Sequence, residues 1–291
     1  MSDPLIVATD ALASGLLTRR DLRRRYTKVH RNVYSRTGVD LSATDRARAA
    51  WLWSGRRATL VGHSAAAILG SKWIPPESPP EVAHARRGVP NGILLRSNCF
   101  RPDELCTVDG ITCTTPARTA YDLGRRLPLE LGVIRIDALL NATRTNVRAV
   151  EAVAERYPGA RGIRGLRRAL ELVDAGAESP QETRLRLLLV DGGLPRPTTQ
   201  IPVRDEAGRV RRRIDMGWPT WKVGVEYDGE QHFTGPDDYA NDIVRLEFLA
   251  ERGWRIVRVS GRQLRYQGPA IVDRALRALV AAGMDPRLHA C

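Results

Sequence analysis

The segment from Arg213 to Phe233 concentrates residue types that can do chemistry. Its sequence, RIDMGWPTWKVGVEYDGEQHF, includes the imidazole of His232 and, among its acids, Asp215, Glu226 and Asp228. Carboxylate oxygens in such a cluster suit Mg²⁺ or Mn²⁺ rather than zinc. A cation held there would bind a phosphate oxygen and offset charge on a leaving oxygen, which is the chemistry of metal-dependent phosphodiester hydrolysis.

The alternation of side chains along a strand predicts which of these acids lie together. If a hairpin turns at Pro219–Lys222, position 215 lies directly across from position 226, with Cβ atoms about 4.5 to 5.5 Å apart. Asp228 then follows one step further along the face that carries Glu226. We therefore expect Asp215 and Glu226 to share one cation. The alternative is a solvent-facing hairpin whose acids pair with Arg211–Arg213.

Hydrophobic periodicity and turn residues predict the elements that position these acids. After Gly176 the chain reads as helix, three strands, helix, strand and helix, which describes a compact mixed domain. The expected spans are a helix at 179–193, strands at 198–203, 210–218 and 221–229, a helix ending near Arg252, a strand at 254–260 and a helix at 269–283.

The same segments carry a resemblance. The motifs SPQE, RID, VEYDG-x-QH, D-x-x-R and GWRIVRV, within about residues 178–282, resemble the nuclease-like domain related to very-short-patch repair endonucleases, in the PD-(D/E)XK superfamily. The resemblance implies an αβββαβα nuclease fold and an endonuclease that uses Mg²⁺ or Mn²⁺. Asp215 and Glu226 would be the metal ligands, Glu182 would be the acid of the leading helix, and Asp228 would support the site.

The chain departs from the superfamily pattern at Asp228, which stands where a lysine is usual. His232 would then supply a proton relay in place of that cation. Glu182 has a second interpretation, because Ser179–Glu182 also has the pattern of a helix capping box with proline at the first helical position. Arg245 is the expected charge partner of the acids, and a surface ion pair with Asp242 is its alternative.

The first 40 residues predict a different kind of unit. They read as two short helices, the second capped by Thr18, followed by a strand, which is the outline of a winged helix-turn-helix. Basic side chains dominate the face that would meet a DNA duplex. The alternative is a solvated helix face on a domain that binds protein. The candidate DNA-binding residues are Arg19, Arg20, Arg23, Arg24, Lys28 and Arg31.

The middle of the chain predicts more helices and a few short strands. Expected helices cover 45–55, 64–70 and 116–127, and a helical region at 129–175 is interrupted by Pro158-Gly159. The Pro-rich segment 73–82 is expected to lie outside regular helix or central strand. Strands at 93–98 and 111–115 are expected to bracket a turn at Val108–Gly110.

Residues 1–140 resemble the N-terminal region of AbiEi-type antitoxins, on the motifs GLLTRRDLRRR, VHRNVYSR, HSAAAILG and TTPARTAYDLGRRLP. The resemblance implies a winged-helix transcriptional repressor that binds promoter DNA through the segment Thr18–Arg31. It also implies a cognate toxin protein as a partner.

Composition is consistent with a DNA partner. The 291 residues hold 46 Lys and Arg against 33 Asp and Glu, a net charge of +13. Most of these cations are arginine, whose planar fork suits phosphate, although a GC-rich genome also enriches arginine. Without a membrane span or a basic start before the first apolar run, we expect a cytoplasmic protein. The spacing of the four cysteines matches no paired zinc motif, so free thiols are expected.

These observations predict an α/β chain, α+β overall, in three parts: a winged-helix region at 1–40, an antitoxin-like mixed and helical region at 41–177, and a nuclease-fold domain at 178–291. The leading functional hypothesis is a DNA-binding protein with a Mg²⁺-dependent endonuclease domain. The alternative is a repressor in which the nuclease fold has become a binding or dimerisation module. A third hypothesis is an antitoxin that binds protein and touches DNA weakly.

Overall fold

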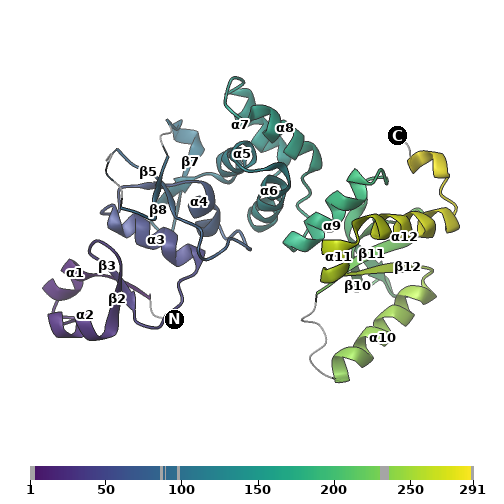
Figure 1. The fold of residues 1–291 in the computed structure, drawn as a ribbon, viewed down its shortest axis with the longest axis horizontal. Coiled ribbons are helices and arrows are strands. Elements are labelled where there is room, and N and C mark those ends of the chain that lie inside the picture. The colour runs from purple at the N-terminus through teal and green to yellow at the C-terminus, as the bar shows by residue number, and fades with distance from the viewer. Residues whose placement is uncertain (1–3, 86–87, 89, 97–98, 230–235, 290–291) are drawn as a thin grey trace. The chain divides into compact units, whose positions relative to one another are not determined.

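The computed structural model describes residues 4–85, 88, 90–96, 99–229 and 236–289 (Figure 1). The chain divides into two compact units, Met1–Val173 and Asp174–Cys291. Both units mix helices with a β-sheet, as an α/β chain requires. None of the helices in the described ranges is long and apolar enough to cross a membrane.

The first unit begins with two short helices and a small antiparallel sheet of order β1-β3-β2. Thr18 and Asp21 form a capping box at the start of the second helix, as the Thr18 pattern predicts. The single strand expected after that helix is instead a hairpin, because Asn32 adopts a φ of 68° and reverses the chain. The elements are β1 (Leu5–Val7), α1 (Ala8–Ala13), α2 (Arg19–Arg25), β2 (Tyr26–His30) and β3 (Val33–Arg36).

A second sheet of this unit has the order β6-β5-β4-β8-β7. The turn at Asp109-Gly110, with φ of 49° and 76°, joins β7 to β8 in an antiparallel pair. The expectation that this turn follows the strand at 93–98 is therefore wrong. The expectation that 73–82 lies outside any central strand is also wrong at its end, because β5 begins directly after the prolines of that segment and lies inside the sheet. The strands are β4 (Thr59–Leu60), β5 (Glu81–Ala83), β6 (Leu94–Leu95), β7 (Leu105–Val108) and β8 (Ile111–Thr114).

Helices pack against this second sheet and against one another. Alanines of α3 and α4 make a tightly packed core with Leu60, Val82 and Ile111 of the strands. The helix α5 starts at Pro116 with Thr115 as its cap, as the Thr-Pro pair predicts. The helices are α3 (Ala43–Trp53), α4 (Gly62–Ile68), α5 (Pro116–Arg126), α6 (Leu129–Thr143), α7 (Val147–Glu155) and α8 (Ile163–Leu172), and a 3₁₀ turn covers Pro102–Glu104.

The second unit has a four-stranded sheet of order β12-β11-β10-β9. Strands β9, β10 and β11 are antiparallel neighbours, and β12 runs parallel to β11. The order of elements is the expected one with α11 added. They are α9 (Pro180–Asp191), β9 (Thr198–Arg204), β10 (Val210–Trp218), β11 (Val223–Asp228), α10 (Pro236–Glu251), β12 (Arg255–Ser260), α11 (Gly261–Tyr266) and α12 (Gly268–Ala281), followed by a 3₁₀ turn at Pro286–His289.

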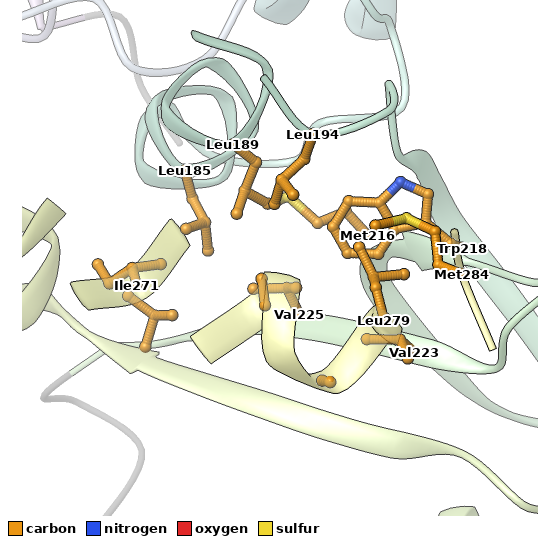
Figure 2. Packing of buried hydrophobic residues seen from close by; sticks show 13 residues of the cluster. Leu185, Leu189, Leu194, Met216, Trp218, Val223, Val225, Ile271, Leu279 and Met284 are labelled. Carbon is orange, nitrogen blue, oxygen red and sulfur yellow. The ribbon is translucent and has the colours of Figure 1, made fainter. Parts of the chain in front are cut away.

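Helices cover both faces of this sheet. On one face, leucines of α9 and α12 such as Leu185 and Leu279 pack on Met216 and Val225 of the central strands (Figure 2). The opposite face packs against α10 in a smaller cluster that includes Ile201, Val203, Ile214 and Leu249. Because both faces are packed, the two central strands are held in a fixed register at the point where they carry the acids.

Candidate acidic site and nucleic-acid interface

The hairpin between β10 and β11 turns where the sequence predicts. The N–H of Lys222 donates to the carbonyl of Pro219 at 3.2 Å, and Lys222 has a φ of 49°. The strands pair as Met216–Val225, Gly217–Gly224 and Trp218–Val223, which is the register that places 215 across from 226. A Cβ at Gly217 would lie 2.3 Å from the carbonyl oxygen of Val223. Glycine is therefore required for this close approach.

The side chain of Asp215 accepts a backbone hydrogen bond from the neighbouring strand, and this bond affects its pKa. Its Oδ2 accepts a hydrogen bond of 2.9 Å from the backbone N–H of Tyr227. Burial raises the pKa of Asp215 to about 6, a rise that this hydrogen bond opposes and the nearby Glu226 carboxylate reinforces. Asp215 therefore titrates near neutral pH, and a bound cation would hold it in its charged form.

Glu226 is the most buried acid of the hairpin, with 4% of its surface exposed. Its Oε1 accepts a hydrogen bond from the guanidinium of Arg245 on α10. Its Oε2 is buried and has no hydrogen-bond partner in the described part of the chain. Burial raises the pKa of Glu226, and Arg245 partly offsets that effect. A buried carboxylate oxygen without a partner is costly, and this one marks a position that a cation or donor would satisfy.

Asp228 belongs to a neighbouring ion-pair network. Its carboxylate accepts from Arg258 of β12 at 2.6 Å, and Arg258 also donates to Asp242 of α10 at 2.6 Å. Asp242 lies 3.6 Å from Arg245, so this network continues to the cation that pairs with Glu226. The cations next to the hairpin acids therefore come from α10 and β12, whereas Arg211–Arg213 lie exposed on β10.

Glu182 lies near enough to Asp215 for the charge of Asp215 to affect its pKa. Ser179 caps the N–H of Glu182 at 3.2 Å, as the capping pattern predicts. The Glu182 carboxylate accepts from the backbone N–H of Glu178 and from the side-chain amide of Gln200. Burial raises the pKa of Glu182, and Asp215 contributes to that rise. The sequence interpretation missed Gln200, whose φ of 50° interrupts the regular alternation of β9.

The donor set fits a hard divalent cation in part. Mg²⁺ commonly binds through one or two carboxylates and keeps several waters, and Asp215 and Glu226 offer such a pair. Among the described residues, no group of three or more His, Cys, Asp or Glu side chains is arranged to hold a metal ion. His232, the expected proton relay, lies outside the described residues.

The expected DNA-binding residues of the first unit share one property. No residue of α2 is buried, and the six basic candidates are all exposed: Arg19, Arg20, Arg23, Arg24, Lys28 and Arg31. Arg19 and Arg23, like Arg20 and Arg24, are four residues apart and so lie on neighbouring turns of the helix surface. The helix and the following hairpin present a continuous basic segment.

One family model matches a part of the chain that lies almost entirely in the first unit. Residues 57–175 match the family model described as the AbiEi antitoxin C-terminal domain. The resemblance noted above assigned residues 1–140 to the N-terminal region of such antitoxins, so the match lies further along the chain and in the other domain of that family.

Two curated relatives come from Mycobacterium tuberculosis, from strains CDC 1551 / Oshkosh and H37Rv. Both are described as uncharacterised proteins, and each is 32% identical over 177 residues, which is 61% of this chain and 65% of the relative. The chain thus spans just under two thirds of the length of these relatives. No solved structure matches the chain significantly.

Proposed function

We propose that this protein is a DNA-binding regulator of the antitoxin type. The observation that carries the proposal is the match of residues 57–175 to the AbiEi antitoxin C-terminal domain, which follows the exposed basic segment of α2 in the same unit. In this proposal residues 1–40 act as a winged helix, and α2 contacts the phosphates of promoter DNA. A cognate toxin protein is the expected second partner.

The physical argument concerns phosphate contacts. A guanidinium is a charged donor that binds phosphate oxygens without reading sequence, and each such contact releases counterions from DNA. The exposed arginines of α2 would therefore supply salt-dependent affinity, while the residues that read bases stay unassigned.

The test is fluorescence anisotropy with duplex DNA from upstream of the protein's own coding sequence, at several salt concentrations. We expect the double variant Arg20→Gln/Arg24→Gln to lose affinity and to reduce the salt slope by about two. The control is Arg167→Gln/Arg168→Gln, which removes the same charge from the exposed surface of α8. Weak binding without salt dependence, or equal loss in both doubles, contradicts the proposal and favours an antitoxin that binds only protein.

A second candidate function is metal-dependent phosphodiester hydrolysis by the second unit. The pair Asp215 and Glu226 favours it, because Oε2 of the buried Glu226 has no hydrogen-bond partner among the described residues. Mg²⁺ or Mn²⁺, held by this pair, would supply a Lewis acid for a phosphate oxygen. Glu182 and Asp228 would support the pair, Arg245 would balance its charge, and His232 would handle a proton.

The test is incubation of supercoiled plasmid and mismatched duplex with purified protein and Mg²⁺ or Mn²⁺. Nicking that requires the metal, disappears in Asp215→Asn and Glu226→Gln and persists in the exposed control Asp273→Asn would establish the nuclease. Absence of cleavage by protein that still binds DNA would leave the second unit as a binding or dimerisation module.

A further inference from the structure

The first unit contains a cavity of about 510 Å³ that neither proposed function uses. It lies where the start of α4, the strands β5 and β6 and the last turns of α5 meet, and Arg161 before α8 completes its wall. Pockets of roughly 300 to 1,000 Å³ are typical for small-molecule ligands. The described residues that line it all belong to this unit.

Charged side chains line the cavity with an excess of cations. Arg96, Arg125, Arg126 and Arg161 face two carboxylates, Glu81 and Asp122. With each arginine counted as +1 and each carboxylate as −1, these residues carry a net charge of +2. An anion is therefore the ligand class that the lining favours.

Glu81 is held in its charged form by the groups around it. Its side chain is 4% exposed, and burial alone would raise its pKa. Hydrogen bonds with the imidazole of His63 at 3.0 Å, its backbone N–H at 3.1 Å and Arg96 at 2.6 Å outweigh burial and lower the pKa of Glu81 to about 2. The carboxylate therefore orients the guanidinium of Arg96 at any ordinary pH.

Asp122 orients the arginines at the end of α5 through ion pairs. Its side chain is fully buried and pairs with Arg125 at 2.9 Å and with Arg126 at 3.1 Å. It also accepts from the buried Arg118 at 3.1 Å. Because several cations share each acid, the acids position the arginines without cancelling their charge.

The rest of the wall is mostly apolar, with His63 and Ser78 as its polar members. Pro79, Leu94, Leu123 and Leu127 line the cavity beside the arginines. A free inorganic anion would use only the charged part of such a site. A ligand that combines a phosphate group with an organic body would use both parts, since arginine forks bind phosphate in a bidentate manner and apolar walls favour the burial of the body.

We propose that this cavity is a binding site for a small organic phosphate of about the size of a mononucleotide. The phosphate contacts Arg96 and Arg161, and the organic group lies against Leu94 and Leu127. The proposal concerns ligand binding only and does not depend on DNA binding or on the acidic site of the second unit.

The test is isothermal titration calorimetry of the full chain with the four ribonucleoside 5′-monophosphates, glucose 6-phosphate and the matching compounds without phosphate. We expect at least one phosphate to bind, and its unphosphorylated counterpart to bind at least about tenfold more weakly. The variant Arg96→Gln/Arg161→Gln should weaken binding by a similar factor. The charge-matched control Arg167→Gln/Arg168→Gln, outside the cavity, should bind like the unchanged protein.

Two results would overturn the proposal. One is the absence of binding by every phosphate in the panel at millimolar concentration. The other is equal weakening in both double variants, which would indicate attraction to the general positive charge of the protein. If the double variant fails to fold, Arg161→Gln compared with the single control Arg167→Gln replaces it, because Arg161 is exposed and lies outside the regular elements.

Discussion

Glu226 on β11 and Arg245 on α10 form an ion pair that joins the sheet of the second unit to the helix covering it. The glutamate side chain is nearly inaccessible, whereas the arginine keeps 27% of its side chain exposed. In this pair the guanidinium remains partly solvated, whereas the carboxylate is almost completely desolvated. The cation lowers the electrostatic cost of keeping Glu226 charged, and it occupies one of the two oxygens that a metal would use.

The stability of this pair can be measured by a double-mutant cycle. We expect Arg245→Met to lower the free energy of unfolding by about 1 to 3 kcal/mol, because it leaves the buried Glu226 without its cation. Glu226→Gln in the same background should recover part of the loss, since the amide carries no charge. Chemical denaturation of the four proteins gives the coupling energy. Additive losses in the double variant would show that the pair has no energetic role.

The raised pKa of Asp215 predicts a pH-dependent effect on stability. With a pKa of about 6 in the folded protein and 3.8 otherwise, the folded state holds a proton that the unfolded state has released between those values. The free energy of unfolding therefore falls as pH rises through that window. Asp215→Asn should gain about 2 to 3 kcal/mol relative to the unchanged protein between pH 4 and pH 7.

Thermal denaturation at half-unit pH steps measures this gain. Asp273→Asn serves as the control for removing one negative charge, because Asp273 lies exposed on α12. A constant difference between Asp215→Asn and the unchanged protein across the range would contradict the assigned pKa.

Gly62 at the start of α4 should tolerate no side chain. It has a φ of +52°, and a Cβ would lie 2.6 Å from Oε1 of Glu81, whose carboxylate is held by His63 and Arg96. We expect Gly62→Ala to destabilise the first unit by about 2 to 4 kcal/mol. Gly70→Ala is the matched control, since Gly70 has a φ of +83° and open space around it.

That control should cost only about 1 kcal/mol, the usual strain of a left-handed alanine. Thermal unfolding of both variants separates backbone strain from collision with Glu81. Equal losses in the two variants would mean that Glu81 moves aside at no cost.

The cysteines of the first unit should differ in reactivity. Cys113 is fully buried, and burial together with the neighbouring Cys106 raises its pKa to about 12. Cys99 is exposed. Because the thiolate is the reactive form, iodoacetamide at neutral pH should label Cys99 first and Cys113 last. Peptide mapping by mass spectrometry gives the order, and early labelling of Cys113 would show that β8 opens readily.

The second unit was more predictable from sequence than the first. Alternating side chains in 221–229, together with a turn at Pro219–Lys222, correctly predicted the hairpin and the register that relates Asp215 to Glu226. These signals are local, so a single segment contains them. The structure adds α11, which begins at Gly261 directly after β12, with Ser260 as its N-cap.

Contacts between distant segments were harder to predict. β4 is only 2 residues long and carries no periodic pattern, yet it forms the middle of its sheet. The arginine-lined cavity draws Arg96, Arg126 and Arg161 from segments separated by loops, and nothing in the spacing of those residues relates them. Arg245 had a local alternative in Asp242, and only the packing of α10 on the sheet decides that it also reaches Glu226.

The glycines 217 and 224, which pair across β10 and β11, imply a particular pattern of tolerated mutations. A Cβ at Gly217 would lie 2.3 Å from a backbone oxygen, so a library of single substitutions should retain glycine alone there. A Cβ at Gly224 would meet the side chains of Ile214 and Ile256, so larger residues should be depleted there less strongly. Asp215 and Glu226, which flank this pair, should accept their amides when the library is selected only for folded protein. If selection for biological activity then depletes the amide variants of Asp215 and Glu226, the same scan separates the glycines needed to fold the hairpin from the acids needed for its function.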